Sequence, residues 1–234
     1  TAFNLVGVCS ANTNVVVVSF SIEESHPHAL LWGTCEDCTK YKYLYETQYI
    51  HYAAAGRSGG SDLVFRCELY PIGDDFDYLR NEAVYTIIQP TKDGKQVMPY
   101  DYRWGTGSMY FRTGHHTPVW YFDDKGIIHQ PVSIGTLGKR ERNNILHSRI
   151  LSVPDDWLVC NGLILPDNYV DVGRFESIYG TCNRFRVYLS STKSREEAML
   201  ARMAEYRGVM LEDIEARKVC GELSRQLFNT RDTR

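Results

Sequence analysis

The chain of 234 residues is long enough to bury a substantial core in one large domain or two small ones. Its hydrophobic content of 43% and charged content of 24% are those of an ordinary globular protein, which argues against intrinsic disorder. A net charge of −3 argues against a protein whose main task is to neutralise nucleic-acid phosphates. No run of about eighteen apolar residues occurs and the first residues lack a basic, apolar leader, so we expect neither a membrane span nor a signal peptide.

The cysteine content indicates a reducing compartment. The seven cysteines are odd in number and follow no framework spacing, so we expect reduced thiols in a cytoplasmic protein rather than a secreted disulfide scaffold. They are Cys9, Cys35, Cys38, Cys67, Cys160, Cys182 and Cys220.

The first part of the chain is dominated by strand signals. Residues 1–13 are a short apolar arm of strand-like character, and the β-branched run Val15–Ile22 predicts a strand buried on both faces. A turn at Glu23–His28 returns the chain into a second strand at Ala29–Trp32. The tyrosine-rich stretch Lys40–Tyr52 alternates well enough to predict a third strand, with a helix as the alternative.

The middle of the chain adds further short strands. The alternation in Leu63–Tyr70 predicts one of them, and an Asp-Gly turn lies within Lys92–Lys95. Asn161-Gly162 favours a type I′ hairpin between two apolar runs, because both residues tolerate positive φ. Lys139–Arg149 is polar and basic, which indicates a short exposed helix or loop. Other strands are expected at Val84–Gln89, Met109–Arg112, Val119–Phe122 and Phe185–Ser190.

The period changes from two to about 3.6 near the C-terminus. Ser194 and Glu197 have the spacing of a capping box, and Met199, Met203 and Met210 follow at helical intervals. We therefore predict a mainly β protein with two parts. Residues 1–190 form an antiparallel β-sandwich, and residues 191–234 form a helical tail that packs on it or on a neighbouring subunit; an α+β fold is the alternative.

His26, His28, Cys35 and Cys38 are the strongest candidates for metal ligands. Two imidazoles and two thiols at adjoining turns could close a tetrahedral zinc site. Against this, Glu36-Asp37 places two carboxylates between the thiols, and the alternative is an ordinary pair of thiols at a strand end. Zinc would make the protein a stabilised binding module, and the basic stretch 139–149 would then contact an acidic partner or RNA.

Catalytic candidates are few. His115 and His116 with Asp123 could form an acid–base or metal cluster, although paired aspartates before Lys-Gly are also ordinary turn chemistry. Cys160 with His147 is a weaker nucleophile–base pair. The loop 104–108 only loosely resembles a phosphate-binding loop. We therefore expect no enzyme activity and assign no catalytic or cofactor-binding residues, with an unrecognised enzyme as a minor alternative.

The tyrosines are unusual as a population. Sixteen phenols are more than one core of this size usually holds, and tyrosine is enriched where protein surfaces meet. Either they fill a tyrosine-rich core and rim, or they anchor contacts between copies of the chain. In the second case the contact residues would be Tyr41, Tyr43, Tyr45, Tyr49, Tyr52, Tyr100, Tyr102, Tyr110 and Tyr121.

Three segments resemble the polyhedrins of insect cypoviruses, which form the crystalline matrix of viral occlusion bodies. They are the run Asn14–Trp32, the loop Gly59-Gly60-Ser61-Asp62, and Leu151–Leu158, together about a fifth of the chain. The resemblance implies a non-enzymatic structural protein that self-assembles, with virus particles as its cargo, in the cytoplasm of an infected cell. It departs from the family at the start, where polyhedrins carry a projecting helix. Because phenols lose their protons near pH 10, a tyrosine-rich lattice would be stable at neutral pH and released in alkali.

Overall fold

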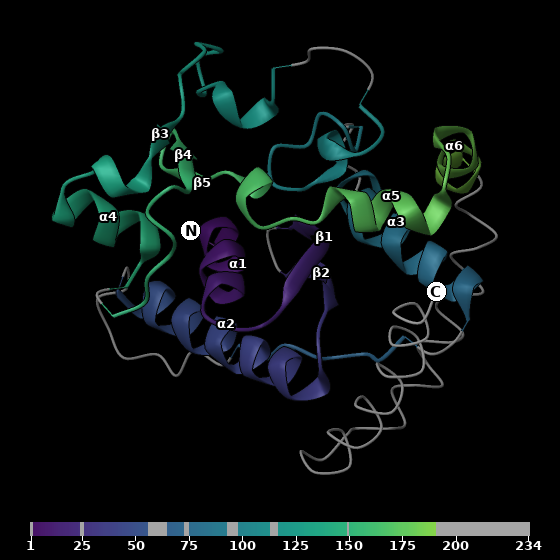
Figure 1. Cartoon of the computed structure of the whole chain (residues 1–234), viewed down its shortest axis with the longest axis horizontal. Helices are drawn as coiled ribbons and strands as arrows, with labels where there is room; N and C mark the ends of the chain where they lie inside the picture. The colour runs from purple at the N-terminus through teal and green to yellow at the C-terminus, as the bar shows by residue number, and fades with distance from the viewer. Residues whose placement is uncertain are drawn as a thin grey trace.

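The computed structural model describes residues 2–23, 26–55, 65–72, 75–92, 98–112, 117–148 and 150–190. The helices are α1 (Ala2–Ala11), α2 (Cys35–Ala55), α3 (Phe76–Lys92), α4 (Lys139–Leu146), α5 (Val172–Tyr179) and α6 (Cys182–Ser190) (Figure 1). The strands are β1 (Val16–Ile22), β2 (Pro27–Trp32), β3 (Val132–Ser133), β4 (Leu158–Cys160) and β5 (Leu163–Ile164). Single 3₁₀ turns occupy Gly107–Met109, Val119–Tyr121, Ile134–Thr136 and Pro166–Asn168.

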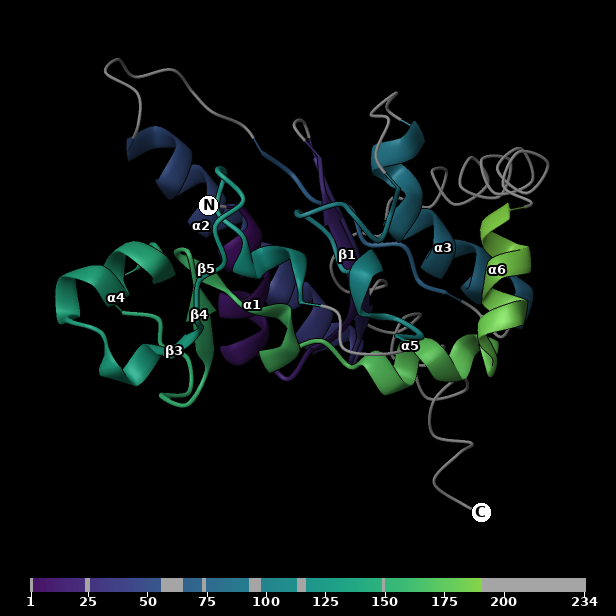
Figure 2. The ribbon, with the colours of Figure 1, turned by 90° about the horizontal axis from the view of Figure 1, so that it is seen from above.

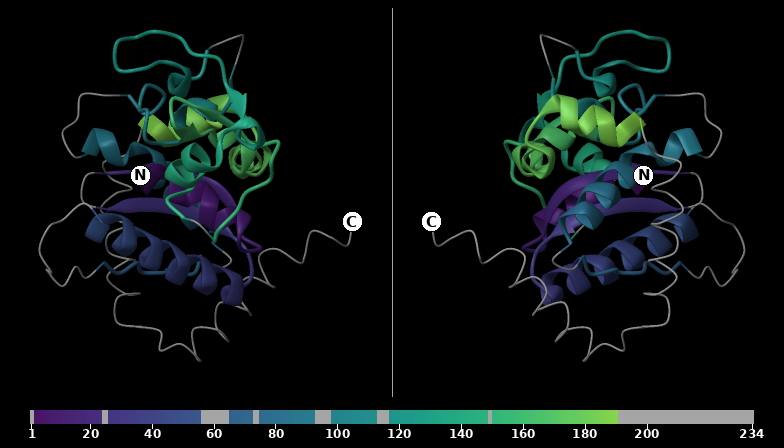
Figure 3. Two further views of the ribbon diagram at one scale, coloured as in Figure 1. Left: turned by 90° about the vertical axis from the view of Figure 1, so that its left-hand side faces the viewer. Right: turned by 90° about the vertical axis from the view of Figure 1, so that its right-hand side faces the viewer.

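The predicted β-sandwich is wrong. The described residues form an antiparallel two-stranded sheet, β1-β2, and a separate antiparallel sheet in the order β3-β4-β5, and helices make up most of the rest. The β1-β2 hairpin lies in the middle of the molecule, with α1 and α2 on one side and α3 and α5 on the other (Figure 2). Figure 3 shows α2 running beneath this hairpin and α5 and α6 on the opposite side. The proposed tail, 191–234, lies outside the described residues.

β1 confirms the strand predicted from the β-branched run. Its inner residues are buried, since helices cover both of its faces, and it pairs with β2 as expected. Its other edge is closed by two loops. Thr106 N donates to Phe20 O at 3.0 Å and Ile22 N to Trp104 O at 2.7 Å, while Asp171 N donates to Val17 O at 2.9 Å. The hairpin therefore serves as the central layer of a mixed helical fold.

The tyrosine-rich stretch is helix α2, so its interpretation as a strand is wrong. Thr34 Oγ1 accepts the amide of Asp37 at 3.1 Å and donates to its carboxylate at 2.7 Å, which caps the first turn. Tyr41, Tyr45 and Tyr49 recur every four residues and stack at 6.4 Å between successive rings. The same stretch also contains a period of two, and the helical period is the one that lets α2 pack against α1.

Other strand predictions are also wrong. The N-terminal arm is α1, and its residues from Phe3 to Cys9 are all buried, so no polar face reveals the helical period. Val84–Gln89 lies within α3, and Phe185–Ser190 lies within α6. Met109–Arg112 forms no strand, and its first residue ends the 3₁₀ turn Gly107–Met109. In Val119–Phe122, the first three residues form a 3₁₀ turn, and Phe122 makes only an isolated antiparallel bridge to Ile128.

Two local predictions are confirmed. Asn161 (φ 51°) and Gly162 (φ 75°) form the hairpin turn between β4 and β5. The basic stretch 139–149 begins with the helix α4, whose first residues are exposed. Within Leu63–Tyr70, residues 65–70 are extended with alternating burial, but they pair with no strand among the described residues. The Asp-Gly turn and the loop Gly59–Asp62 fall on residues that the structure leaves undescribed.

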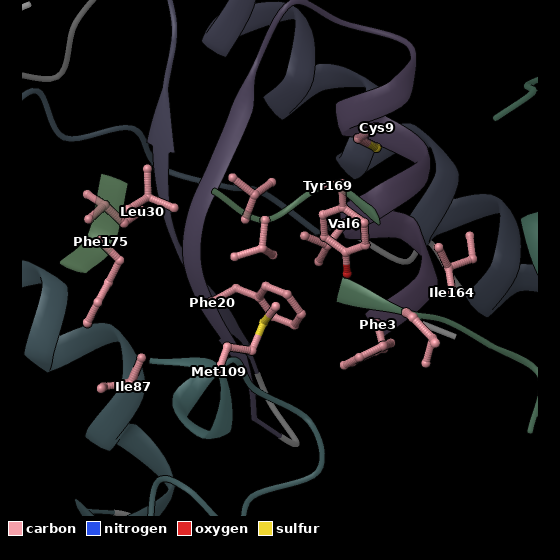
Figure 4. Close-up of a cluster of buried hydrophobic side chains, with 14 of the residues drawn as sticks. Phe3, Val6, Cys9, Phe20, Leu30, Ile87, Met109, Ile164, Tyr169 and Phe175 are labelled. Carbon is pink, nitrogen blue, oxygen red and sulfur yellow. The ribbon is translucent and has the colours of Figure 1, made fainter. Parts of the chain in front are cut away.

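In the core, aromatic rings and the buried amide of Asn4 join α1 to other elements. Phe20 of β1 stacks on Tyr169 at 6.2 Å and meets Phe3 edge-on at 5.4 Å (Figure 4). The Asn4 amide donates to Ile145 O and Gly162 O at 3.0 and 2.8 Å and accepts the amide of Ile164 at 3.0 Å. This single side chain ties α1 to α4 and to β5.

Candidate ligand cavity

A cavity of about 530 Å³ opens beside β2. Its walls are β2, the extended segment 65–72, α3, α5 and the first turn of α2. The volume lies within the range of small-molecule sites, about 300–1,000 Å³. The apolar and aromatic lining residues include Leu30, Trp32, Phe65, Leu69, Tyr70, Ile72, Phe76, Tyr78, Leu79, Tyr85 and Ile178.

The segment 65–72 forms one wall because side chains of α2 hold it. The Phe65 ring packs on Tyr49 at 4.2 Å and on Tyr45 at 6.2 Å. The backbone amide of Cys67 donates to the Glu46 carboxylate. Phe65 and Cys67 are half-buried and the intervening Arg66 is exposed, so the alternation in sequence fixes which side chains anchor this wall.

Trp32 and Arg174 form a rigid corner of the cavity. The guanidinium lies 3.6 Å from the centre of the Trp32 ring, a cation–π contact. Arg174 Nε also donates to Asp171 at 3.1 Å, and the Asp171 carboxylate caps α5 by accepting the amide of Arg174 at 2.8 Å. These contacts hold the indole in place, and the charge of Arg174 is largely neutralised by its neighbour.

Polar groups of both signs complete the lining. The rings of His26 and His28 meet at 4.6 Å, and His28 meets Tyr85 of α3 edge-on at 5.6 Å. The lining also contains two carboxylates, Glu68 and Glu82, and two guanidinium groups, Arg66 and Arg174, so the numbers of acidic and basic groups are equal. The cavity therefore offers a largely apolar interior with a few hydrogen-bonding groups and no excess of one charge.

Thiols also line this cavity, from Cys35, Cys38 and Cys67. Burial, with smaller contributions from Cys35 and Asp37, raises the pKa of Cys38 to about 12. Burial and the nearby Glu46 raise the pKa of Cys67 to about 12 as well. Both groups are thus neutral thiols at physiological pH, because the apolar surroundings penalise the thiolate.

The four predicted zinc ligands all line this one cavity, but at different places. His26 and His28 lie at the start of β2, whereas Cys35 and Cys38 follow its end. An extended strand of this length separates its ends by roughly 16 Å, while zinc ligands must all lie within about 2.3 Å of the metal. In the described part of the chain, no three histidine, cysteine, aspartate or glutamate side chains form a group that could hold a metal ion. Zinc binding by these residues stays a prediction.

The catalytic candidates are not brought together in the described residues. Asp123 accepts a hydrogen bond from His129 Nε2 at 3.0 Å, which holds the pKa of the carboxyl below its usual range. His115 and His116 fall on undescribed residues. The Cys160 thiol donates to the backbone oxygen of His129 at 3.5 Å, whereas the His147 ring packs on Tyr52 at 4.6 Å.

The loop 104–108 has a structural role. Thr106 is completely buried, and its hydroxyl accepts the amide of Phe20 at 3.0 Å and forms a hydrogen bond of 2.7 Å with the hydroxyl of Tyr110. A Cβ atom at Gly107 would lie 2.3 Å from the oxygen of Pro99, so only glycine fits there. The two glycines that suggested a phosphate-binding loop allow close packing instead, Gly105 against β1 and Gly107 against Pro99.

The proposed contact tyrosines fall into two groups. Tyr41, Tyr45, Tyr102 and Tyr110 are buried in the core of the chain itself, where the Tyr110 hydroxyl donates to Val18 O at 2.7 Å. These four cannot be reached by a neighbouring copy. Tyr49 and Tyr121 are half-buried, and the exposed members are Tyr43, Tyr52 and Tyr100.

Comparison of the chain with family models, curated proteins and solved structures gives no match. The resemblance to polyhedrins therefore stays a prediction. Among the described helices, none combines the length and the apolar character that crossing a bilayer requires. The cavity itself was missed from sequence because its walls come from separated segments, and the one visible signal was the half-buried alternation of residues 65–69.

Proposed function

We propose that this protein binds a small, mostly apolar ligand in the cavity between β2, the segment 65–72 and α3. The observation that supports the proposal most directly is the cavity of about 530 Å³, lined by aromatic rings from several elements. Such concave, largely apolar sites with a few convergent polar groups are the usual form of small-molecule sites. The role is that of a binding protein, without a chemical step of its own.

The lining favours a neutral or weakly charged ligand with a flat apolar body. Trp32, Phe65, Phe76 and Tyr85 present ring faces and edges, which suit a planar or cyclic group. A strongly anionic ligand gains little from Arg174, because Asp171 and the Trp32 ring already engage its guanidinium. A hydroxyl or carbonyl on the ligand would find hydrogen-bonding partners where His26 and His28 line the cavity.

The proposal is tested by titration with N-phenyl-1-naphthylamine, a neutral probe whose fluorescence rises in an apolar site. We expect saturable binding of one probe per chain. In the variant Ala29→Trp, an exposed cavity-lining residue of β2 gains an indole that takes up part of the cavity, and affinity should fall at least tenfold.

A matched control is Ile150→Trp, which adds an indole at a residue that is 87% exposed and lies outside the cavity lining. This variant should bind the probe as the unmodified chain does. Equal affinity in both variants, or no saturable binding by a cooperatively folded protein, would overturn the proposal.

A second candidate, self-assembly, is favoured by an exposed apolar patch. Ile127 and Ile128, in the loop that leads into β3, are 55% and 53% exposed, and Val132, the first residue of β3, is 45% exposed. We propose that a second copy covers this patch, since large apolar side chains grouped at the surface mark contact sites. Light scattering at neutral pH tests it: Ile128→Asp should shift large particles to small ones, and an unchanged monomer in both proteins would contradict it.

A further inference from the structure

We propose that Cys35 and Cys38 are a dithiol pair that closes reversibly into a disulfide in the cavity wall, with a small-molecule disulfide as the oxidant. The pair is independent of the proposed ligand, since it needs only access through the cavity. Both residues carry thiols in the structure, and both line the cavity. The sequence motif is Cys35-Glu36-Asp37-Cys38.

Helix geometry brings the two side chains together. Cys35 is the first residue of α2, and Cys38 lies one turn later on the same face. Their Cα atoms are separated by on the order of 5 Å in a regular helix, within the usual disulfide range of about 4.4–6.8 Å. Their Cβ atoms must approach by roughly 1–2 Å, because side chains at this spacing lie about 5–6 Å apart.

The first turn of α2 can provide this movement. Cys35 is the first residue of the helix, so the backbone on its N-terminal side is not constrained to helical dihedral angles. Cys38 is held within the first turn, because its amide donates to Thr34 O at 2.9 Å. We expect Cys35 to move toward a fixed Cys38, with Thr34 and Asp37 keeping the cap intact.

Exposure decides which thiol reacts first. Cys38 is half-buried, whereas Cys35 is only 4% exposed. The Cys38 thiolate therefore attacks the small disulfide, forms a mixed disulfide and releases one small thiolate, which takes up a proton. The Cys35 thiol then loses its proton and attacks the Cys38 sulfur, forming the Cys35–Cys38 bond and expelling the second small thiol. Two protein thiols are oxidised and one small disulfide is reduced to two thiols.

The environment makes this exchange slow at neutral pH. Because the thiolate is the nucleophile and the pKa of Cys38 is raised to about 12, only a small fraction of Cys38 is reactive near pH 7. Below that pKa the thiolate fraction grows about tenfold per pH unit. The pair is consequently a slow redox-sensitive feature, unlike the fast catalytic thiols whose pKa a helix N-terminus lowers.

The test treats the full chain with oxidised glutathione over a series of mildly alkaline pH values, blocks remaining thiols, and maps the linkages by peptide mass spectrometry. We expect a Cys35–Cys38 link within one peptide, formed about tenfold faster for each added pH unit and reversed by dithiothreitol. Persistent glutathione on Cys38 beside a reduced Cys35, a Cys38–Cys67 link, or no reaction would each overturn the proposal.

Two variants identify the thiol that resolves the mixed disulfide on Cys38. In Cys35→Ala, glutathione should remain attached to Cys38, because the resolving thiol is gone. Cys67→Ala is the matched control, since Cys67 lines the same cavity with its pKa raised to a similar value of about 12. The Cys35–Cys38 link should form in this variant at an unchanged rate; loss of the link would assign the chemistry to Cys67.

Discussion

The two strands of the central hairpin are neighbours with opposite surroundings. β1 is buried, and its free edge is closed by the loops at 104–106 and 170–171. β2 instead lines a cavity of about 530 Å³. We call the lining of the cavity, which includes Val18 and the first turn of α2, the open side. The rest of α1, α2 and β1, together with the loop 104–106, is the closed side. Substitutions on the closed side should affect stability, whereas substitutions on the open side should affect binding.

The largest expected effect on the closed side comes from alkaline pH. Burial raises the pKa values of Tyr41 and Tyr45 in α2 well above their ordinary range, and the same holds for Tyr110, Tyr169 and Tyr179. The native state keeps these protons when the unfolded state has lost them. Stability is therefore complete below about pH 10 and falls as pH rises further, by about 1.4 kcal/mol per pH unit for each phenol.

Denaturant titrations at several pH values above 10 measure this slope. Tyr41→Phe removes one buried phenol and should make the decline shallower by about 1.4 kcal/mol per pH unit. Tyr43→Phe, at a residue 43% exposed, is the control and should leave the slope unchanged. A stability that stays flat between pH 10 and 12 would contradict the burial argument.

The next largest effect is expected for Asn4→Leu. The substitution leaves the backbone groups of Ile145, Gly162 and Ile164 without their buried partner. Each orphaned group costs about 1–3 kcal/mol, so the free energy of unfolding should fall by about 3 kcal/mol or more. Chemical denaturation measures it.

The control for Asn4 is Asn12→Ala, whose exposed amide donates to Val8 O at 2.7 Å and Ser152 O at 2.8 Å. Here solvent replaces the lost partners, so the change should stay near 1 kcal/mol. If both variants lost the same stability, the hydrogen bonds of the buried Asn4 amide would contribute no more to stability than those of an exposed amide.

Thr106→Val should have a somewhat smaller effect. Valine has the shape of threonine but leaves the amide of Phe20 without its acceptor, and Tyr110 keeps only its bond to Val18 O. We expect a loss of about 2–3 kcal/mol, measured by thermal unfolding. Thr136→Val, on the surface with one bond to Ser133 O, should change stability by less than about 0.5 kcal/mol. A reversed order would contradict the closed-side role of the loop 104–106.

The smallest effect on stability is expected on the open side. Phe76 lines the cavity and is 40% exposed, so Phe76→Ala should cost less than about 1 kcal/mol of stability. Probe affinity should nevertheless fall about five- to tenfold, because the ring face that contacts the probe is lost. Fluorescence titration beside thermal unfolding separates the two quantities. If Phe76→Ala strongly lowered stability and left probe affinity unchanged, the claim that open-side residues serve binding and not stability would be wrong.

The sequence predicted the elements whose signal is local. The β-branched run of β1 is buried on both faces as expected, and Asn161-Gly162 has the two positive φ angles that its residue types favour. The tyrosines of α2 fit both the strand period of two and the helical period of about 3.6. α1 shows no polar–apolar period in its sequence, because its residues are buried on all sides. In both cases contacts with distant residues decided the structure, which no local pattern contains.

The candidate site was predicted only in part. His26, His28, Cys35 and Cys38 were recognised as chemically interesting, and all of them line the cavity. The two histidines lie at one end of β2 and the two cysteines beyond its other end, and their grouping as zinc ligands stays a prediction. The aromatic walls could not be predicted, because Phe65, Phe76 and Trp32 come from segments that meet only after folding.

The most direct test of the account is to map the bound probe by NMR on the isotope-labelled chain. Shift changes on adding N-phenyl-1-naphthylamine should be confined to the amides of β2, residues 65–72 and the cavity-facing turns of α3 and α5. That result would place the ligand on the open side of the hairpin. Changes centred on Ile127, Ile128 and Val132, with the cavity amides unmoved, would contradict the account and identify the exposed patch as the binding surface instead.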